Sequence, residues 1–214
     1  MYNQNRGNYG GGRDGNRGGR RPFQNRGNQQ FRPKRNPLPE GFSLYYIALV
    51  CPDAINETFK GFKDYMFQKY GCKAASKSPA HITVVPPFRA EDDLEKNLAD
   101  FVSTFNFGIV PFDVVLSGYS NFGDRVLFVD VQPNNSLLQM EQDCMADFAG
   151  QFPSIIFGMK PPFNPHVTIA TRDIPEGKLS EAKQYFETQQ PYHQAFEAKE
   201  LRLVKLVQGD WKVL

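Results

Sequence analysis

Two short segments with the same pattern constrain the fold most: each reads His, apolar, Thr, apolar. They are His81–Val84 and His166–Ile169. Side chains alternate between the two faces of a strand, so in each segment the His and Thr share one face and the apolar pair faces the core. Two such strands side by side would offer two imidazoles and two hydroxyls to one small ligand. The chain has only three histidines, and two of them follow this pattern.

Residues 1–37 differ in composition from the remainder. They contain eight Arg, one Lys and a single acidic residue, Asp14, and so carry a net charge of +8. Because the whole chain is +2, residues 38–214 carry −6. The first segment is rich in Gly, Asn, Gln and Arg and buries too little apolar surface to offset its ordering entropy. We predict a disordered tail over 1–37 and a single mildly acidic domain over 38–214.

The predicted tail has the composition of an RNA-binding arm. Arg-Gly pairs recur in it, with Tyr and Phe residues between them. Arginine contacts phosphates, and aromatic rings and guanidinium planes stack on bases. We expect sequence-tolerant binding to RNA; the alternative is a solubilising or promiscuous tail.

Several compartments and partner classes are not expected. The N-terminus has no apolar core of a secretory signal, and no apolar run reaches the roughly 18 residues of a membrane span. The three cysteines, Cys51, Cys72 and Cys144, show no C-x-x-C spacing. This usage fits buried thiols in a reducing compartment. We expect a cytoplasmic monomer without a membrane partner.

The remainder of the chain alternates strands and helices in a coarse repeat. A strand over 42–50 is expected to be central, and Pro86-Pro87 to stop the first motif strand. Helices are expected over 55–70 with Asp53 as N-cap, 91–105, from a capping box at Ser136 to Gly150, and 178–189. Further strands are expected near 110–118, 125–131, 196–207 and 211–214. Because strict βαβ alternation is absent, we predict an α+β fold with two similar lobes, each giving one motif strand to a shared cleft.

Paired histidines facing one ligand suit acid–base chemistry at a phosphodiester. A neutral imidazole removes a proton from the nucleophile, and an imidazolium protonates the leaving oxygen; both forms exist near neutral pH. The Thr hydroxyls would donate hydrogen bonds to the non-bridging oxygens. The sequence has no H-x-H, H-E-x-x-H or Cys/His cluster at ligand spacing, so neither a metal nor a cofactor is expected.

The paired motifs, 85 residues apart, and their contexts HITVVPPF and FNPHVTIATR resemble the 2H phosphoesterase superfamily. The likeness is greatest to its bacterial 2′-5′ RNA ligase / cyclic phosphodiesterase (LigT-like) branch. It covers about residues 42–214, including a C-terminal segment that resembles the family's closing hairpin. The resemblance implies a bilobal, pseudo-symmetric fold and chemistry on 2′,3′-cyclic phosphates or 2′,5′-linked RNA.

Carried over residue by residue, the resemblance implies an acid–base pair and two phosphate ligands: His81 and His166, with Thr83 and Thr168. Members often have Arg five residues after the second His. This chain has Thr171 there and Arg172 one place later. On an unbroken strand Arg172 would share the face of the second motif, so it is a weaker candidate phosphate ligand.

Four aromatic residues near the motifs are candidates for stacking on a base: Phe88, Phe163, Tyr119 and Phe122. Core packing is the favoured alternative for Phe88 and Phe163. The Thr residues have an alternative role as strand formers. His193 lacks the motif and is expected on the surface.

We therefore interpret the chain as a metal-independent RNA phosphoesterase: a 2′,3′-cyclic phosphodiesterase, a 2′-5′ RNA ligase, or both. Its expected ligand is RNA or a nucleotide with a 2′,3′-cyclic phosphate or 2′,5′ linkage. The alternative is a non-catalytic RNA-binding protein that grips phosphate without turnover. The sequence leaves open the reaction direction and which His is the acid.

Overall fold

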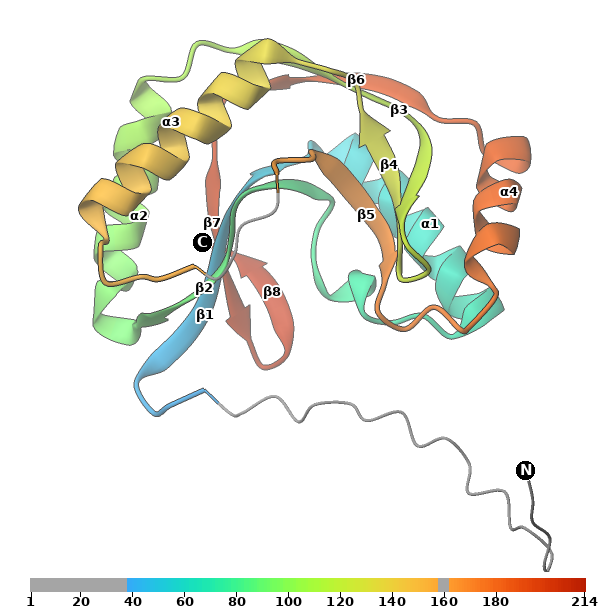
Figure 1. The fold of residues 1–214 in the computed structure, drawn as a ribbon, viewed down its shortest axis with the longest axis horizontal. Coiled ribbons are helices and arrows are strands. Elements are labelled where there is room, and N and C mark those ends of the chain that lie inside the picture. Colours follow the sequence, from blue (N-terminus) through green and yellow to red (C-terminus); the bar gives the residue numbers. More distant parts are fainter. Residues whose placement is uncertain (1–37, 158–161) are drawn as a thin grey trace, which may run out of the picture. The chain divides into compact units, whose positions relative to one another are not determined.

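Two antiparallel four-stranded sheets organise the protein (Figure 1). The computed structural model describes residues 38–157 and 162–214, and Leu38–Leu214 form one compact unit. The tail predicted over 1–37 lies outside the described residues. The first sheet has the order β2-β1-β7-β8: β2 His81–Glu91, β1 Phe42–Val50, β7 Arg202–Val207 and β8 Asp210–Val213. The second has the order β5-β4-β3-β6: β5 His166–Thr171, β4 Val126–Val131, β3 Phe112–Phe122 and β6 His193–Ala198.

The two motif strands, β2 and β5, each form the edge of a sheet, and they contact one another. The predicted alternation is confirmed on both. The apolar motif residues are at most 1 % exposed, whereas the His and Thr residues are partly exposed: Ile82, Val84, Val167 and Ile169 against His81, Thr83, His166 and Thr168. Strand β1 lies inside its sheet, as its nearly continuous apolar sequence predicts.

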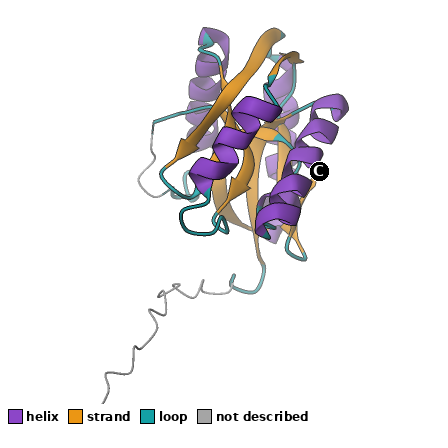
Figure 2. Ribbon diagram, turned by 90° about the vertical axis from the view of Figure 1, so that its right-hand side faces the viewer, coloured by secondary structure: helices purple, strands orange, loops and turns teal. Residues whose placement is uncertain are grey.

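Four helices cover the sheets: α1 Asp53–Tyr70, α2 Glu95–Phe107, α3 Asn135–Gln151 and α4 Leu179–Gln189. Two 3-10 turns, Ala75–Lys77 and Asp92–Leu94, precede β2 and α2. Some of the helices lie in front of the strands in the side view of Figure 2. The chain thus repeats one unit, β1-α1-β2-α2 and then β4-α3-β5-α4, so the two-lobed α+β fold is confirmed.

The repeated units exchange their first helices. Phe62 of α1 packs under the second sheet, with its ring centroid 6.2 Å from that of Tyr119 in β3 and 5.2 Å from that of Phe186 in α4. Conversely, Phe148 of α3 lies 4.9 Å from Phe88 of β2 in the first sheet. One continuous hydrophobic core therefore runs through both lobes.

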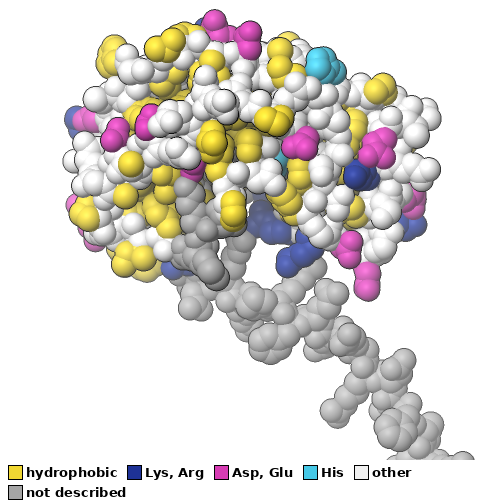
Figure 3. Space-filling model, turned by 45° about the horizontal axis from the view of Figure 1, so that its top comes forward, with side chains coloured by type: hydrophobic (Ala, Val, Ile, Leu, Met, Phe, Trp, Pro, Cys, Tyr) yellow, Lys and Arg dark blue, Asp and Glu magenta, His cyan; other side chains and the backbone are white. Residues whose placement is uncertain are grey.

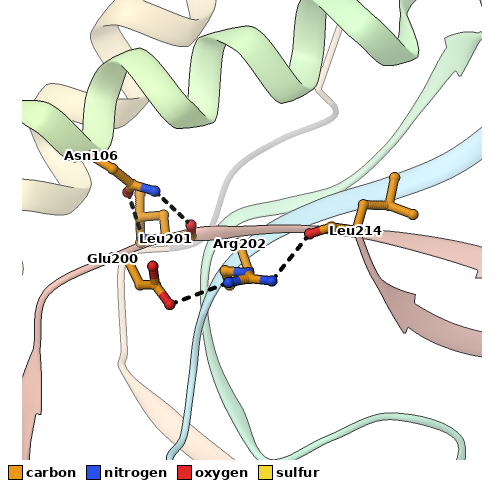
Figure 4. Close-up of polar contacts among 5 residues, drawn as sticks. All are labelled: Asn106, Glu200, Leu201, Arg202 and Leu214. Atoms are coloured by element: carbon orange, nitrogen blue, oxygen red, sulfur yellow. Dashed lines mark hydrogen bonds and ion pairs between the residues drawn. The ribbon is translucent and has the colours of Figure 1, made fainter.

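Hydrogen bonds tie β7 to its surroundings (Figure 4). The Asn106 side chain, at the end of α2, accepts from the Leu201 N–H at 2.7 Å and donates to the Leu201 carbonyl at 3.0 Å. Arg202 contacts Glu200 at 3.3 Å and donates to the Leu214 carbonyl at 3.5 Å. These contacts fasten the start of β7 to α2 and Leu214 to β7, within the sheet that carries His81.

Three expectations about strand and helix boundaries are wrong. Strand β2 does not stop at Pro86-Pro87 but continues to Glu91, because an edge strand can lose a backbone donor on its open side. The pairing with β1 shifts register there. The cap of α3 is Asn134, whose Oδ1 accepts from the Leu137 N–H at 2.8 Å, and not Ser136. Similarly, Pro52 occupies the cap position of α1 and Asp53 begins the helix.

None of the helices in the described part of the chain is both long and apolar enough to cross a membrane.

Candidate active site

His81 opens strand β2, and its ring is oriented by the turn before it. Its Nδ1 lies 2.8 Å from the Pro79 carbonyl oxygen and 3.1 Å from Ser78 Oγ. A carbonyl oxygen only accepts, so Nδ1 carries the proton and donates it to Pro79. In the neutral ring the lone pair is therefore on Nε2, the atom that can take up a proton.

His166 opens strand β5 with the same arrangement. Its Nδ1 lies 2.7 Å from the Asn164 carbonyl oxygen, again two residues before the histidine. Neither Nε2 has a hydrogen-bond partner among the described residues. The two rings thus have the same fixed tautomer, and each leaves one nitrogen free for proton transfer.

Aromatic side chains hold both imidazoles. The Tyr46 ring stacks on His81, with centroids 4.8 Å apart and planes 25° apart. Phe122 meets His166 edge to face at 4.8 Å, and Phe128 lies at the same distance in a tilted geometry. These contacts restrict the ring positions and reduce the access of water to each imidazole.

The register of each sheet places the motif threonines. Thr83 pairs with Ala48, and Thr168 pairs with Phe128. Directly paired residues share a face of a sheet. Because Phe128 contacts His166, Thr168 lies on the His166 face. Likewise Ala48 shares a face with Tyr46, two residues before it, and Tyr46 contacts His81, so Thr83 lies on the His81 face.

The two histidines have different electrostatic surroundings. Burial lowers the pKa of His81 to about 4, and the positive charges of Lys63 and His166 act in the same direction, against the Pro79 hydrogen bond. Burial also lowers the pKa of His166, but the Asn164 carbonyl and the Asp130 carboxylate oppose it. Asp130 is the residue paired with His166 on β4. One imidazole therefore has a cation beside it, and the other has an anion.

Lys63 is a residue of this neighbourhood that sequence reasoning missed. It is only 7 % exposed, and its Nζ donates to the Ser78 carbonyl at 2.8 Å. Burial lowers its pKa to about 8. A signal was present, because Lys63 follows Phe59 by four residues and so lies on the buried face of α1.

The geometric basis for Arg172 as a phosphate ligand is wrong, because β5 is not an unbroken strand. Its pairing with β4 shifts between Phe128↔Thr168 and Leu127↔Ala170, which indicates a bulge. After the bulge it is Thr171, paired with Val126, that shares the face of Thr168. The strand ends at Thr171, and Arg172 has a left-handed backbone with φ of 68°.

Two of the four aromatic candidates for base stacking are core residues, and that hypothesis is wrong for them. Phe88 is 4 % exposed and packs on Phe148. Tyr119 is 8 % exposed, and its hydroxyl donates to the Gln190 carbonyl. Phe163 is partly buried against the core, as the alternative of core packing predicts. Phe122 is 37 % exposed beside His166 and remains a candidate.

Other polar groups lie apart from this arrangement. His193 is exposed, and its Nδ1 lies 3.1 Å from Ser117 Oγ. All three cysteines are buried. Within residues 38–157 and 162–214, no group of three or more His, Cys, Asp or Glu side chains is placed to hold a metal ion.

Comparison with known proteins matches residues 51–210 to the 2′-5′ RNA ligase superfamily. A protein of Geobacillus kaustophilus (strain HTA426), named "Putative phosphoesterase GK0864", is 25 % identical over 173 residues, which are 79 % of this chain and 92 % of that protein. Among solved structures, E. coli LigT complexed with 3′-AMP aligns with a TM-score of 0.58 and 18 % identity over 81 % of this chain and 94 % of that one. TT0787 of Thermus thermophilus aligns with a TM-score of 0.54 and 18 % identity, over 80 % and 94 %. These structures share the fold described above.

Proposed function

Because the chain belongs to the 2′-5′ RNA ligase superfamily of phosphoesterases, we propose that it opens 2′,3′-cyclic phosphates at RNA ends with His81 and His166 as its acid–base pair. One observation carries the proposal. Two imidazoles lie on contacting edge strands, and each has Nδ1 committed to a backbone carbonyl and Nε2 free. That arrangement suits two simultaneous proton transfers on either side of one phosphorus.

In the proposed hydrolysis, Nε2 of one neutral histidine removes a proton from water as the water oxygen bonds to phosphorus. The bond from phosphorus to one ribose oxygen breaks, and the Nε2–H of the second histidine protonates that oxygen. Thr83 and Thr168 donate hydrogen bonds to the non-bridging oxygens, where negative charge increases in the transition state. The product is a phosphomonoester with a free ribose hydroxyl, and the two histidines have exchanged protonation states.

The surroundings of the histidines favour one assignment of roles for hydrolysis. Burial, with the charge of Lys63 acting in the same direction, lowers the pKa of His81 to about 4, so His81 is the base. Burial also lowers the pKa of His166, but Asp130 opposes it, so His166 is the acid. Ligation uses the same geometry with a 5′-hydroxyl in place of water, and the roles follow the positions of the nucleophile and leaving oxygen.

Nucleotide binding in relatives supports a nucleotide or RNA-end substrate. E. coli LigT, which shares this fold, has been crystallised with 3′-AMP and with ATP. Residues 38–214 carry a net charge of −6 and residues 1–37 carry +8. On the face drawn in Figure 3, basic side chains are few apart from a group at the lower edge. We propose that residues 1–37 supply much of the attraction to RNA phosphates.

The test is incubation of the full chain with RNA that ends in a 2′,3′-cyclic phosphate, in the presence of EDTA. We expect conversion to a phosphomonoester end, and joined products when a 5′-hydroxyl RNA is added. Absence of both products, with the RNA still bound, would favour the non-catalytic RNA-binding alternative.

The pH dependence follows from the lowered pKa values. One histidine must be neutral and the other protonated, so the plot of kcat/KM against pH should be bell-shaped. The pKa values of the two histidines in the free enzyme set its two sides. Since burial lowers both pKa values below the usual 6.5, the maximum should lie on the acid side of 6.5, and kcat/KM should fall as pH rises through neutrality. The kcat profile should lie at higher pH, because the bound phosphate anion favours protonated imidazoles. A kcat/KM that stays constant from pH 5 to 8 would contradict the pair.

A further inference from the structure

A pocket of about 460 Å³ lies behind the turn that positions His81. Its walls come from α1, from residues 76–80 and from the β7–β8 hairpin. Four lysines line it: Lys60, Lys63, Lys77 and Lys212. We refer to it as the Lys63 pocket.

We propose that the Lys63 pocket binds a phosphate of the RNA strand next to the reacting phosphate, so that the protein acts on oligonucleotides in preference to mononucleotides. This inference rests on the proposed function, since it extends the same site. It assigns a ligand to the four lysines of the pocket, of which only Lys63 enters the proposed chemistry, through its charge near His81.

The main observation is the buried ammonium of Lys63. The side chain is 7 % exposed, and no carboxylate of the described residues lies within ion-pair distance. Among residues 38–157 and 162–214 its Nζ has one hydrogen bond, to the Ser78 carbonyl, out of the three an ammonium can donate. A buried cation without a counter-ion is costly, and an anion that enters the pocket would remove that cost.

The other charges of the pocket leave a positive balance. Three carboxylates face it, from Glu57, Asp64 and Asp210, against the four lysines. Glu57 pairs with Lys60 at 3.8 Å, whereas Lys77 and Lys212 have no ion pair within the described ranges. Two further ammonium groups can therefore join Lys63 on one phosphate, to which Lys binds as a point charge.

Trp211 connects the pocket to the catalytic face. It lines the pocket and meets Tyr46 edge to face at 4.7 Å, and Tyr46 stacks on His81. Ser78 also contacts both regions: its carbonyl accepts from Lys63, and its hydroxyl lies 3.1 Å from His81 Nδ1. The side chains of Trp211, Tyr46 and Ser78 thus link the Lys63 pocket to the reacting site. Lysines beside a partly exposed aromatic ring are groups that hold single-stranded RNA through phosphate contact and base stacking.

The test uses Trp211, the chain's single tryptophan, as a fluorescent reporter of this pocket. The full chain carrying His166→Ala, which removes turnover, is titrated with a short single-stranded RNA ending in a 3′-phosphate, with 3′-AMP and with inorganic phosphate. We expect the oligonucleotide to change the fluorescence at about tenfold lower concentration than 3′-AMP, as one added charge-assisted contact provides.

Lys63→Met should remove that tenfold preference, and Lys77→Met with Lys212→Met should weaken it and reduce the salt dependence of binding. The slope of the logarithm of affinity against the logarithm of salt concentration should become shallower by about 0.7 for each phosphate that is no longer bound. Lys96→Met on α2 is the matched control, because Lys96 is an exposed lysine paired with Asp100 away from the pocket. We call the variant with Lys77→Met and Lys212→Met the rim variant. It still tests the inference if Lys63→Met fails to fold.

Equal affinity of the protein for the oligonucleotide and for 3′-AMP would overturn the inference, and so would an unchanged preference for the oligonucleotide in the rim variant. If inorganic phosphate alone produced the whole fluorescence change, the ligand would be a free anion and not RNA. Because binding is measured without turnover, these results are separate from the proposed function, which is tested by product formation in the wild-type chain.

Discussion

Replacing His81 with alanine is expected to lower kcat for cyclic-phosphate hydrolysis by about 10²–10⁴-fold, and His166→Ala should do the same. Each variant removes the only proton-transferring Nε2 on its side of the phosphorus. The double variant should lose little more than either single variant, because the two transfers belong to one step. KM should change less than kcat, since the phosphate contacts proposed for the threonines and for the Lys63 pocket remain.

The measurement is single-turnover hydrolysis of a cyclic-phosphate RNA, with the circular dichroism of each variant compared with wild type. His193→Ala is the matched control: it removes the third histidine, which is exposed and contacts Ser117. We expect its rate to equal that of wild type. Turnover by His81→Ala within a factor of two of wild type would refute the mechanism even if the protein is an enzyme.

Much of the fold could be predicted because its signals are local. Period-2 alternation in the motifs predicts half-buried strands, and both are half-buried in the structure. The apolar spacing from Ile55 to Met66 predicts α1, and Gly71, with φ of 73°, ends that helix as expected. These patterns depend on a few neighbouring residues, and the tertiary structure did not override them.

What could not be predicted depends on contacts between distant segments. Periodicity shows which face of α1 is buried but not which sheet it covers, so the helix exchange between lobes is invisible in the sequence. The bulge in β5 is equally hidden: nothing in Thr168–Arg172 indicates an extra residue, yet it decides that Thr171 and not Arg172 shares the motif face. The burial of Tyr119 has the same origin, because it comes from α1 and α4, which are remote in sequence.

The helix exchange leads to a second large effect: Phe148→Ala is expected to lower the free energy of unfolding by about 3–5 kcal/mol. Phe148 of α3 is fully buried. Its ring meets four other phenylalanine rings with centroids 4.9 to 5.8 Å apart: Phe88, Phe101, Phe152 and Phe157. Truncation leaves a cavity that these rings cannot fill without moving β2, and the loss is a large part of the roughly 5–15 kcal/mol typical of a domain.

The measurement is urea unfolding of wild type and variant, followed both by circular dichroism and by the fluorescence of Trp211. Phe107→Ala is the control, because Phe107 at the end of α2 is 90 % exposed, and its removal should change stability by no more than about 0.5 kcal/mol. Since α3 belongs to the second repeated unit and Phe88 to the first, the loss of stability should affect both lobes. Trp211, on the hairpin of the first sheet, should therefore report the same lowered midpoint as the helices. The contrary result is that Trp211 fluorescence keeps the wild-type urea midpoint while the circular dichroism of the helices is lost at lower urea. It would show that the lobes unfold independently and that the exchanged helices do not couple the two histidine strands.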